Sequence, residues 1–317
     1  MSAAALSSRA IIGAYYARLA QNPGAQWVNG ISNYFNSDQE SESYKWLGQA
    51  PAMREWIGGR NAKGFRDNGI TITNKHFEAT LDVLVRDMRR DKTGQIMARV
   101  NDLADRTNAH WASLLSTLVL NGASTLCYDG QYFFDTDHTE GENTTSQSNK
   151  LSVDISALST AQHGSVTAPS VEEMQQSILQ GVQQIISLKD DQNEPMNENA
   201  QNFLVMVPTS LWTTAAAAVN NSILTSNAIN LIPNLENVTI GVAMNARINS
   251  WTDRFAIFRT DGSVKPLIRQ EETAVQLKAK AEGSEYEFDN DAHQYGVDTW
   301  RNVGYGYWQQ ACQVIII

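Results

Sequence analysis

The chain has 317 residues, of which 42% are hydrophobic and 18% are charged, and its net charge is −10 with a pI of about 5.0. This composition is typical of a globular protein with a sizeable core, in one large domain or two intertwined ones. Phosphates repel an acidic chain, so the charge argues against a general nucleic-acid binder. No apolar run approaches the ~18 residues that would span a bilayer. Residues 1–6 carry no charged leader, so we expect no signal peptide and a soluble protein made in a cytoplasm.

The first expected element is an amphipathic helix over residues 8–21. A turn at Asn22, Pro23 and Gly24 ends it. Its apolar face consists of Ile12, Tyr15, Tyr16 and Leu19.

Residues 25–45 are polar with scattered aromatic side chains, among them Trp27, Tyr34 and Phe35. Such a segment has too few apolar residues for a core of its own. Aromatic residues are enriched at protein interfaces, so docking on a neighbouring surface is the favoured interpretation. The alternative is that the segment packs on its own body.

Residues 46–82 begin with a basic segment that turn signals interrupt, at Gly58–Gly59 and again at 67–69. β-Branched and aromatic residues follow at Thr71, Thr73, Phe77, Thr80 and Val83, which predicts strands through residues 71–83. We therefore expect an extended two-stranded arm. An isolated hairpin is barely stable in water, so the arm needs another subunit to lie on. The candidate subunit-interface residues are Arg54, Trp56, Arg60, Lys63, Arg66, Trp27, Tyr34 and Phe35.

A long amphipathic helix is predicted over residues 95–120, where apolar residues recur at steps of four and three. At 1.5 Å per residue it is roughly 37 Å long. Asn121–Gly122 should end it in the left-handed conformation. The expected buried face is Ile96, Val100, Leu103, Thr107, Trp111, Leu114 and Leu118.

Residues 127–138 combine aromatic and acidic side chains. The favoured interpretation is a tight turn at Asp129–Gly130, anchored by Phe133 and Phe134. The alternative is a cation site formed by Asp135, Asp137 and His138, although the spacing lacks the remaining ligands of a recognised loop.

The last half of the chain alternates helices and strands. After a polar surface excursion over 139–169, Ser170 and Glu173 form a capping box before a helix that ends near Lys189. A buried strand over 203–207 precedes a helix capped by Thr209 or Ser210. Further strands are expected at 238–242, 255–258, 275–279 and 286–288, and residues 314–317 should pair inside a sheet.

The sequence carries no recognised motif for catalysis or for nucleotide binding. No P-loop, dinucleotide fingerprint, nucleophile elbow or His-Glu-x-x-His motif occurs. Cys127 and Cys312 are expected to be reduced and buried, with a disulfide as the alternative. We therefore predict no catalytic residue, no cofactor and no structural zinc.

Two motifs, LGQAPAMREWI at residues 47–57 and CYDGQYFFDTDH at residues 127–138, resemble the major head subunits of Mu-like tailed bacteriophages. The resemblance implies an α+β fold like that of the Hong Kong 97 capsid protein. It predicts an N-terminal arm (1–45), an extended β-hairpin loop (46–82), a peripheral domain with a long spine helix (83–127), an axial domain (128–250) and a return to the peripheral domain (251–317).

The resemblance implies a structural protein and not an enzyme. Pentamers and hexamers of the chain would form an icosahedral head in the virion, assembled in the host bacterial cytoplasm. Its expected partners are other copies of itself, portal and scaffolding proteins, possible decoration proteins and, without specificity, the packaged double-stranded DNA. The alternative function is a metal-dependent enzyme with its site at Asp135, Asp137 and His138.

Overall fold

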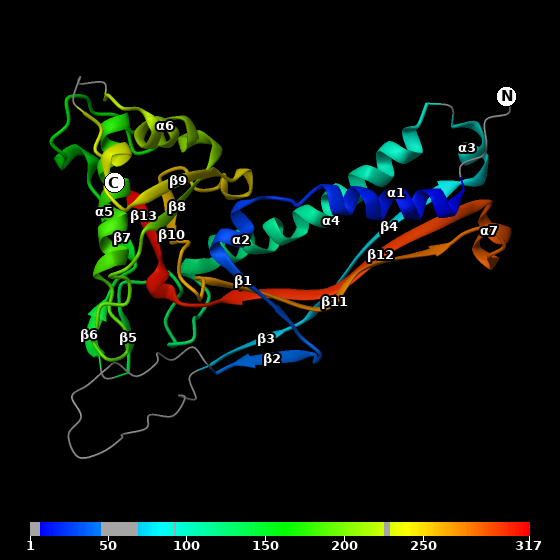
Figure 1. Ribbon diagram of the computed structural model, residues 1–317, viewed down its shortest axis with the longest axis horizontal. Coiled ribbons are helices and arrows are strands. Elements are labelled where there is room, and N and C mark those ends of the chain that lie inside the picture. The colour runs from blue at the N-terminus through cyan, green and yellow to red at the C-terminus, as the bar shows by residue number, and fades with distance from the viewer. Residues whose placement is uncertain (1–6, 46–68, 92, 142, 225–228) are drawn as a thin grey trace, which may run out of the picture.

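The computed structural model describes residues 7–45, 69–91, 93–141, 143–224 and 229–317. Figure 1 shows an elongated molecule with two parts, a long arm and a more compact body. The arm consists of a four-stranded sheet with two helices along it, and the body consists of a five-stranded sheet with two helices. The fold is α+β, as the sequence predicted.

The arm is built on a sheet with strand order β1-β11-β12-β4, in which only the β1–β11 pair is parallel. Helices α1 and α4 lie side by side along it (Figure 1), and Ile11, Tyr15, Val100 and Tyr295 are buried between the helices and the sheet. The arm contains α1 (Ser8–Gln21), α2 (Trp27–Ile31), β1 (Ser32–Asn36), β4 (Lys75–Leu84), α3 (Val85–Arg90), α4 (Gln95–Leu120), β11 (Leu267–Lys280), α7 (Glu285–Asn290) and β12 (Ala292–Tyr305).

The body is built on a sheet with strand order β7-β13-β10-β8-β9. Helices α5 and α6 pack on it, because their apolar sides and the inner residues of the strands form one continuous cluster that includes Ile178, Leu211, Val205 and Ile257. The body contains β7 (Lys150–Val153), α5 (Val171–Ser187), β8 (Asn202–Val207), α6 (Thr209–Asn220), β9 (Thr239–Met244), β10 (Arg254–Arg259) and β13 (Ala311–Ile316).

Two small antiparallel ribbons complete the described chain: β2 (Ser41–Tyr44) pairs with β3 (Ile70–Thr73), and β5 (His138–Glu140) pairs with β6 (Asn143–Gln147). The first ribbon flanks residues 46–68, which lie outside the described residues, so the two-stranded hairpin predicted there stays a prediction. Residues 75–82 were also placed in that hairpin, but as part of β4 they pair with β12 in the four-stranded sheet. A third core cluster joins the arm to the body and includes Leu115, Phe133, Tyr305 and Trp308.

The predicted bounds of α1 and α4 are confirmed. The predicted buried face of α4 is correct for the first half of the helix and wrong for the second. Its first half buries Ile96 and Val100 as expected, whereas its second half buries Leu115 and Val119 in place of Leu114 and Leu118. The predicted positions follow the period of an α-helix closely, so the period does not explain the difference. The first half of α4 packs in the core of the arm, whereas the second half packs in the cluster that joins the arm to the body, and Leu115 and Val119 face that cluster.

The buried face of α1 also differs from the prediction. Ile11 and Tyr15 are fully buried, while Ile12 is partly buried and Tyr16 is 41% exposed. Because α4 covers α1 from the side, the buried positions follow that contact.

The predicted N-terminal cap is confirmed for α5 and wrong for α6. Ser170 and Glu173 form the predicted capping box, although α5 ends at Ser187, two residues before Lys189. The cap of α6 does not come from its own start: Pro208 is the N-cap, and the side-chain oxygen of Asn249 accepts from the Thr209 N–H at 2.9 Å.

Three further predictions were wrong. Residues 286–288 belong to helix α7, because the Ser284 hydroxyl accepts from the Glu287 N–H and starts a helical turn. Asn121–Gly122 continues as a 3₁₀ turn with φ of −84° at Asn121 and is not left-handed. Residues 139–169 are not simply a surface excursion, since β7 joins the five-stranded sheet beside β13.

The C-terminal run pairs inside the sheet as predicted, with β13 between β10 and β7. Cys127 and Cys312 are both free and buried, which confirms the favoured prediction. Among the residues that the structure describes, no helix combines the length and the apolar character needed to cross a bilayer.

Candidate functional site

The sequence-predicted interface residues fall into two groups. Arg54, Trp56, Arg60, Lys63 and Arg66 lie outside the described residues, between the β2 and β3 strands that flank them. Trp27, Tyr34 and Phe35 lie within the described chain.

The three described aromatic residues contact their own chain. Trp27, which opens α2, and Phe35, on β1, are partly buried against the junction core. The Phe35 ring is 5.4 Å from the ring of Tyr44. Tyr34 is 45% exposed, so among the three it retains the most surface for a neighbour. An interface role for these residues remains a prediction.

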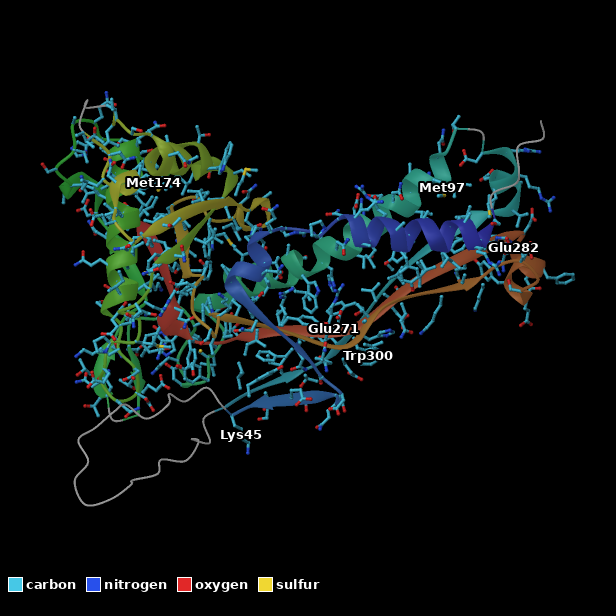
Figure 2. The ribbon with its side chains drawn as sticks, in the orientation of Figure 1. Lys45, Met97, Met174, Glu271, Glu282 and Trp300 are labelled. Atoms are coloured by element: carbon cyan, nitrogen blue, oxygen red, sulfur yellow. The ribbon has the colours of Figure 1, made fainter. Side chains whose placement is uncertain are left out.

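Tyr34 belongs to a layered stack on the arm. Its ring meets Trp111 of α4 edge to face at 6.2 Å, and its hydroxyl donates to Glu271. The guanidinium groups of Arg269 and Arg301 lie 5.5 and 4.6 Å from the Trp111 ring, a distance at which cations attract aromatic faces. Figure 2 shows Glu271 midway along the arm. The stack ties β1, α4 and the sheet together and fixes the direction of the ribbon that follows β1.

Burial and hydrogen bonding shift the pKa of groups in this stack. The pKa of Tyr34 rises to about 12, because burial and the adjacent Glu271 carboxylate both disfavour the phenolate. Burial lowers the pKa of Arg301, and Glu271 offsets part of that effect. The Tyr34 hydroxyl therefore keeps its proton at neutral pH and can donate to Glu271.

The motif at residues 127–138 anchors the junction between arm and body. The His138 ring is fully buried and stacks on Trp308 at 3.9 Å with an interplanar angle of 6°. Its Nδ1 lies 2.6 Å from the buried Asp129 carboxylate. Asn149 donates to the carbonyls of Phe133 and Trp308 at 2.7 and 3.1 Å, so it connects the motif to the C-terminal part of the chain.

The alternative cation site is not supported by this geometry. His138 faces Asp129 and Asn149 in place of the two predicted aspartates. Asp135 accepts from the N–H groups of Thr136 and Tyr132 at 2.8 and 3.2 Å. Burial by itself would raise the pKa of Asp135, but these donors outweigh it and the pKa is lowered. Within the described part of the chain, no group of three His, Cys, Asp or Glu side chains is placed to hold a metal ion.

Sequence reasoning missed a buried carboxyl group at the same junction. Glu140 is 6% exposed and accepts from Tyr128 Oη and Gln309 Nε2, both at 2.8 Å. Burial, together with the nearby carboxylates of Asp191 and Asp129, raises its pKa to about 7. No local pattern marks Glu140, because its partner Gln309 is 169 residues away.

Comparison with known proteins shows which family the chain is similar to in sequence. The sequence model of the family described as "Mu-like prophage major head subunit gpT" matches residues 9–161 and 238–315. The chain is 34% identical over 113 residues to the Mu-like prophage FluMu major head subunit of Haemophilus influenzae, and 33% identical over 110 residues to the major capsid protein of Escherichia phage Mu. These matches cover 36% and 35% of this chain, and they span only 37% and 36% of the two relatives' lengths.

Solved structures share the fold over nearly the whole chain. The procapsid of bacteriophage JBD30 matches with a TM-score of 0.56 and 24% identity, covering 96% of this chain and 72% of that one. The capsid of Cyanophage P-SCSP1u matches with a TM-score of 0.55 and 9% identity, covering 90% and 86%. At such low identities the likeness shows the fold alone, which is the Hong Kong 97-like α+β fold of phage capsid proteins.

Proposed function

The chain belongs to the family of Mu-like prophage major head subunits, and we propose that copies of it assemble as pentamers and hexamers into the icosahedral head of a tailed bacteriophage, around double-stranded DNA. Family membership is the observation that carries the proposal. The elongated form of the described chain also supports it, because a narrow arm exposes much surface that neighbouring subunits would cover.

The proposal gives each part of the chain a role. The α4 helix and its sheet act as the rigid spine, while the segment between β2 and β3 reaches a neighbouring subunit and adapts to its different settings in pentamers and hexamers. Arg54, Trp56, Arg60, Lys63 and Arg66 would contact acidic patches on that neighbour, which sets orientation more than affinity.

Further partners follow from the same proposal. A portal protein, a scaffolding protein and possible decoration proteins would contact the shell, and assembly would take place in the host bacterial cytoplasm. The net charge of −10 supports a wall that holds the packaged DNA without binding it tightly.

The test is the size of the assembled product. The purified chain should form particles of many megadaltons, seen by sedimentation and negative-stain microscopy; a small soluble oligomer would contradict the proposal. The double variant Arg60→Glu, Arg66→Glu should remain folded by circular dichroism but fail to form particles. The matched control Arg60→Lys, Arg66→Lys keeps both charges and should assemble. Normal particles from the Glu variant would refute the role of the two arginines.

A further inference from the structure

The tip of the arm presents one aromatic side chain almost entirely to solvent. Phe288 of α7 is 91% exposed, more than any other large hydrophobic residue in the described chain, where Ile229 follows at 72%. Scattered hydrophobic residues on a surface are ordinary. Phe288 is unusual because its ring is almost wholly in water. Burying an aromatic side chain removes about 150–250 Å² of surface from water, so a partner that covers this ring would gain binding free energy.

The helix that carries Phe288 is held in place. The Glu287 carboxylate accepts from the Gly283 N–H at 2.6 Å and lies 3.0 Å from His293 Nε2. Asp291 ends the helix in the left-handed conformation with φ of 47°. The ring is therefore presented by an ordered element, which lowers the entropy cost of binding.

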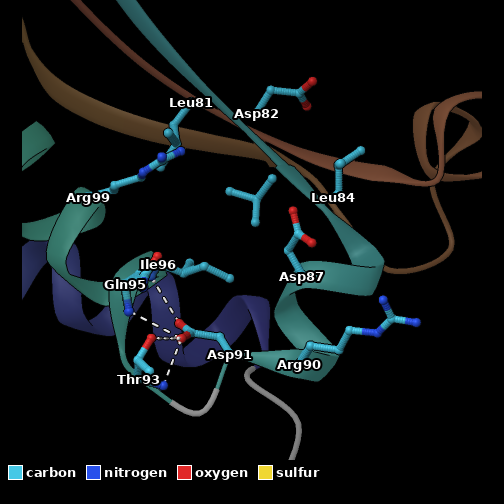
Figure 3. Close-up of a pocket in the computed structure, with 11 residues that line it drawn as sticks. Leu81, Asp82, Leu84, Asp87, Arg90, Asp91, Thr93, Gln95, Ile96 and Arg99 are labelled. Atoms are coloured by element: carbon cyan, nitrogen blue, oxygen red, sulfur yellow. Dashed lines mark hydrogen bonds between the residues drawn. The ribbon is translucent and has the colours of Figure 1, made fainter.

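A hollow opens at the same end of the arm, between β4, α3 and the start of α4 (Figure 3). Its volume is about 460 Å³, within the range of small-molecule sites and ample for one aromatic ring. Its apolar lining comes from Leu81, Val83, Leu84 and Ile96. Phe288 of the same chain does not fill the hollow, since its ring is exposed.

The charges around these two features are complementary. Arg90 and Arg99 lie on either side of the hollow (Figure 3), and neither forms an ion pair with another described residue. On α7, Glu285 and Asp289 flank Phe288 and likewise form no ion pair within the described chain.

The acidic side chains that line the hollow are already engaged by their own chain. Asp91 accepts from the N–H groups of Gln95 and Ile96 at the start of α4, and these bonds lower its pKa. Asp87 contacts Arg86 at 3.7 Å. Asp82 is a hydrogen-bond partner of Tyr286. The two arginines thus remain available for carboxylates from outside.

We propose that Phe288 of one subunit inserts into the tip hollow of a neighbouring copy, with Glu285 and Asp289 facing that copy's Arg90 and Arg99. The inference rests on the proposed shell function and adds one specific contact to it. The contact joins two different surfaces, so it is heterologous. Both surfaces lie at the same end of the arm (Figure 1), so copies whose tips meet around an axis satisfy each other in turn.

Cross-linking of assembled particles tests the contact directly. The variant Phe288→Cys, Leu84→Cys should form disulfide-linked multimers in particles after mild oxidation, because Leu84 lines the hollow and is only partly buried, while each single variant should not. The background is low because Cys127 and Cys312 are buried. Absence of multimers from particles that form normally would overturn the contact, and so would an intrachain link in unassembled subunits.

Substitution gives an independent test. Phe288→Asp should weaken each contact by roughly 10- to 100-fold, the factor that full burial of a phenylalanine supplies, and should lower the urea midpoint for particle dissociation. Phe288→Tyr keeps the ring and is the matched control. Asp289→Arg should have the same defect as Phe288→Asp, and adding Arg99→Asp should restore the midpoint.

The outcomes separate the two proposals. If the unaltered chain forms no particles, the shell function fails. If particles form and Phe288→Asp leaves their dissociation midpoint unchanged, the shell function stands and the tip contact is wrong.

Discussion

Two glycines in helices provide a sharp test of how α5 packs on the body sheet. Gly13 lies in α1 and Gly181 in α5. A methyl group added at Gly13 would meet no atom within 4 Å, whereas one added at Gly181 would lie 2.6 Å from Ile257 Cδ1 and 2.8 Å from Val314 Cγ2. The same substitution to alanine therefore has different consequences at the two positions.

The magnitudes follow from two opposing effects. Alanine in place of a helical glycine gains about 0.5–1 kcal/mol, because the unfolded chain loses less entropy on folding. At Gly13 this gain stands alone, so Gly13→Ala should stabilise the chain by that amount. At Gly181 the new methyl group forces apart fully buried side chains, and overpacking costs about 1–3 kcal/mol. Gly181→Ala should therefore destabilise by a net amount on the order of 1 kcal/mol.

Urea unfolding of the unassembled chain, followed by circular dichroism, measures both free energies of unfolding. The expected result is a rise for Gly13→Ala and a fall for Gly181→Ala. Stabilisation by Gly181→Ala would refute the close packing of α5 against β10 and β13. A fall with Gly13→Ala would instead mean that the exposed side of α1 has contacts that the structure lacks.

Three other predictions concern the junction between arm and body. Leu115→Ala should lower the free energy of unfolding by about 2–5 kcal/mol, because Leu115 is fully buried; a loss below 1 kcal/mol in urea unfolding would contradict that burial. His138→Ala should cost on the order of 3 kcal/mol, since the buried Asp129 carboxylate then keeps only the Gln131 N–H as a partner, and Asp129→Asn combined with it should recover part of the loss in a double-mutant cycle. Glu140 has a folded pKa of about 7, above its ordinary value of 4.5, so the folded state binds more protons than the unfolded state between these pH values. Its contribution to stability therefore falls by about 3 kcal/mol as the pH rises from 4.5 to 7, and Glu140→Gln should remove that slope when unfolding is measured across this range.

The helices were predictable from the sequence because their signals are local. The steps of three and four residues predicted the bounds of α1 and α4, and the Ser170–Glu173 pair marked the start of α5. The two motifs at residues 47–57 and 127–138 indicated the family. Each of these signals lies within a few residues, so no knowledge of distant neighbours was needed.

Features that depend on contacts between distant residues could not be predicted. Glu140 has a partner 169 residues away, and the cap of α6 comes from Asn249, 40 residues after Thr209. Helix α4 ends before Asn121–Gly122 as predicted, but the reason for the glycine is a distant contact: its missing side chain leaves room for the Phe134 ring, which would lie 2.5 Å from an added methyl group.

The sequence by itself determined the family, the helical segments and the alternation of helices and strands in the body, because residue periodicity and motifs express local physical preferences. Only the tertiary structure decided which side of α4 is buried, that His138 faces Asp129, and that the exposed ring of Phe288 lies at the same tip as the hollow between β4, α3 and α4. Burial and pairing depend on which segments meet in space, and that follows from the packing of the whole chain.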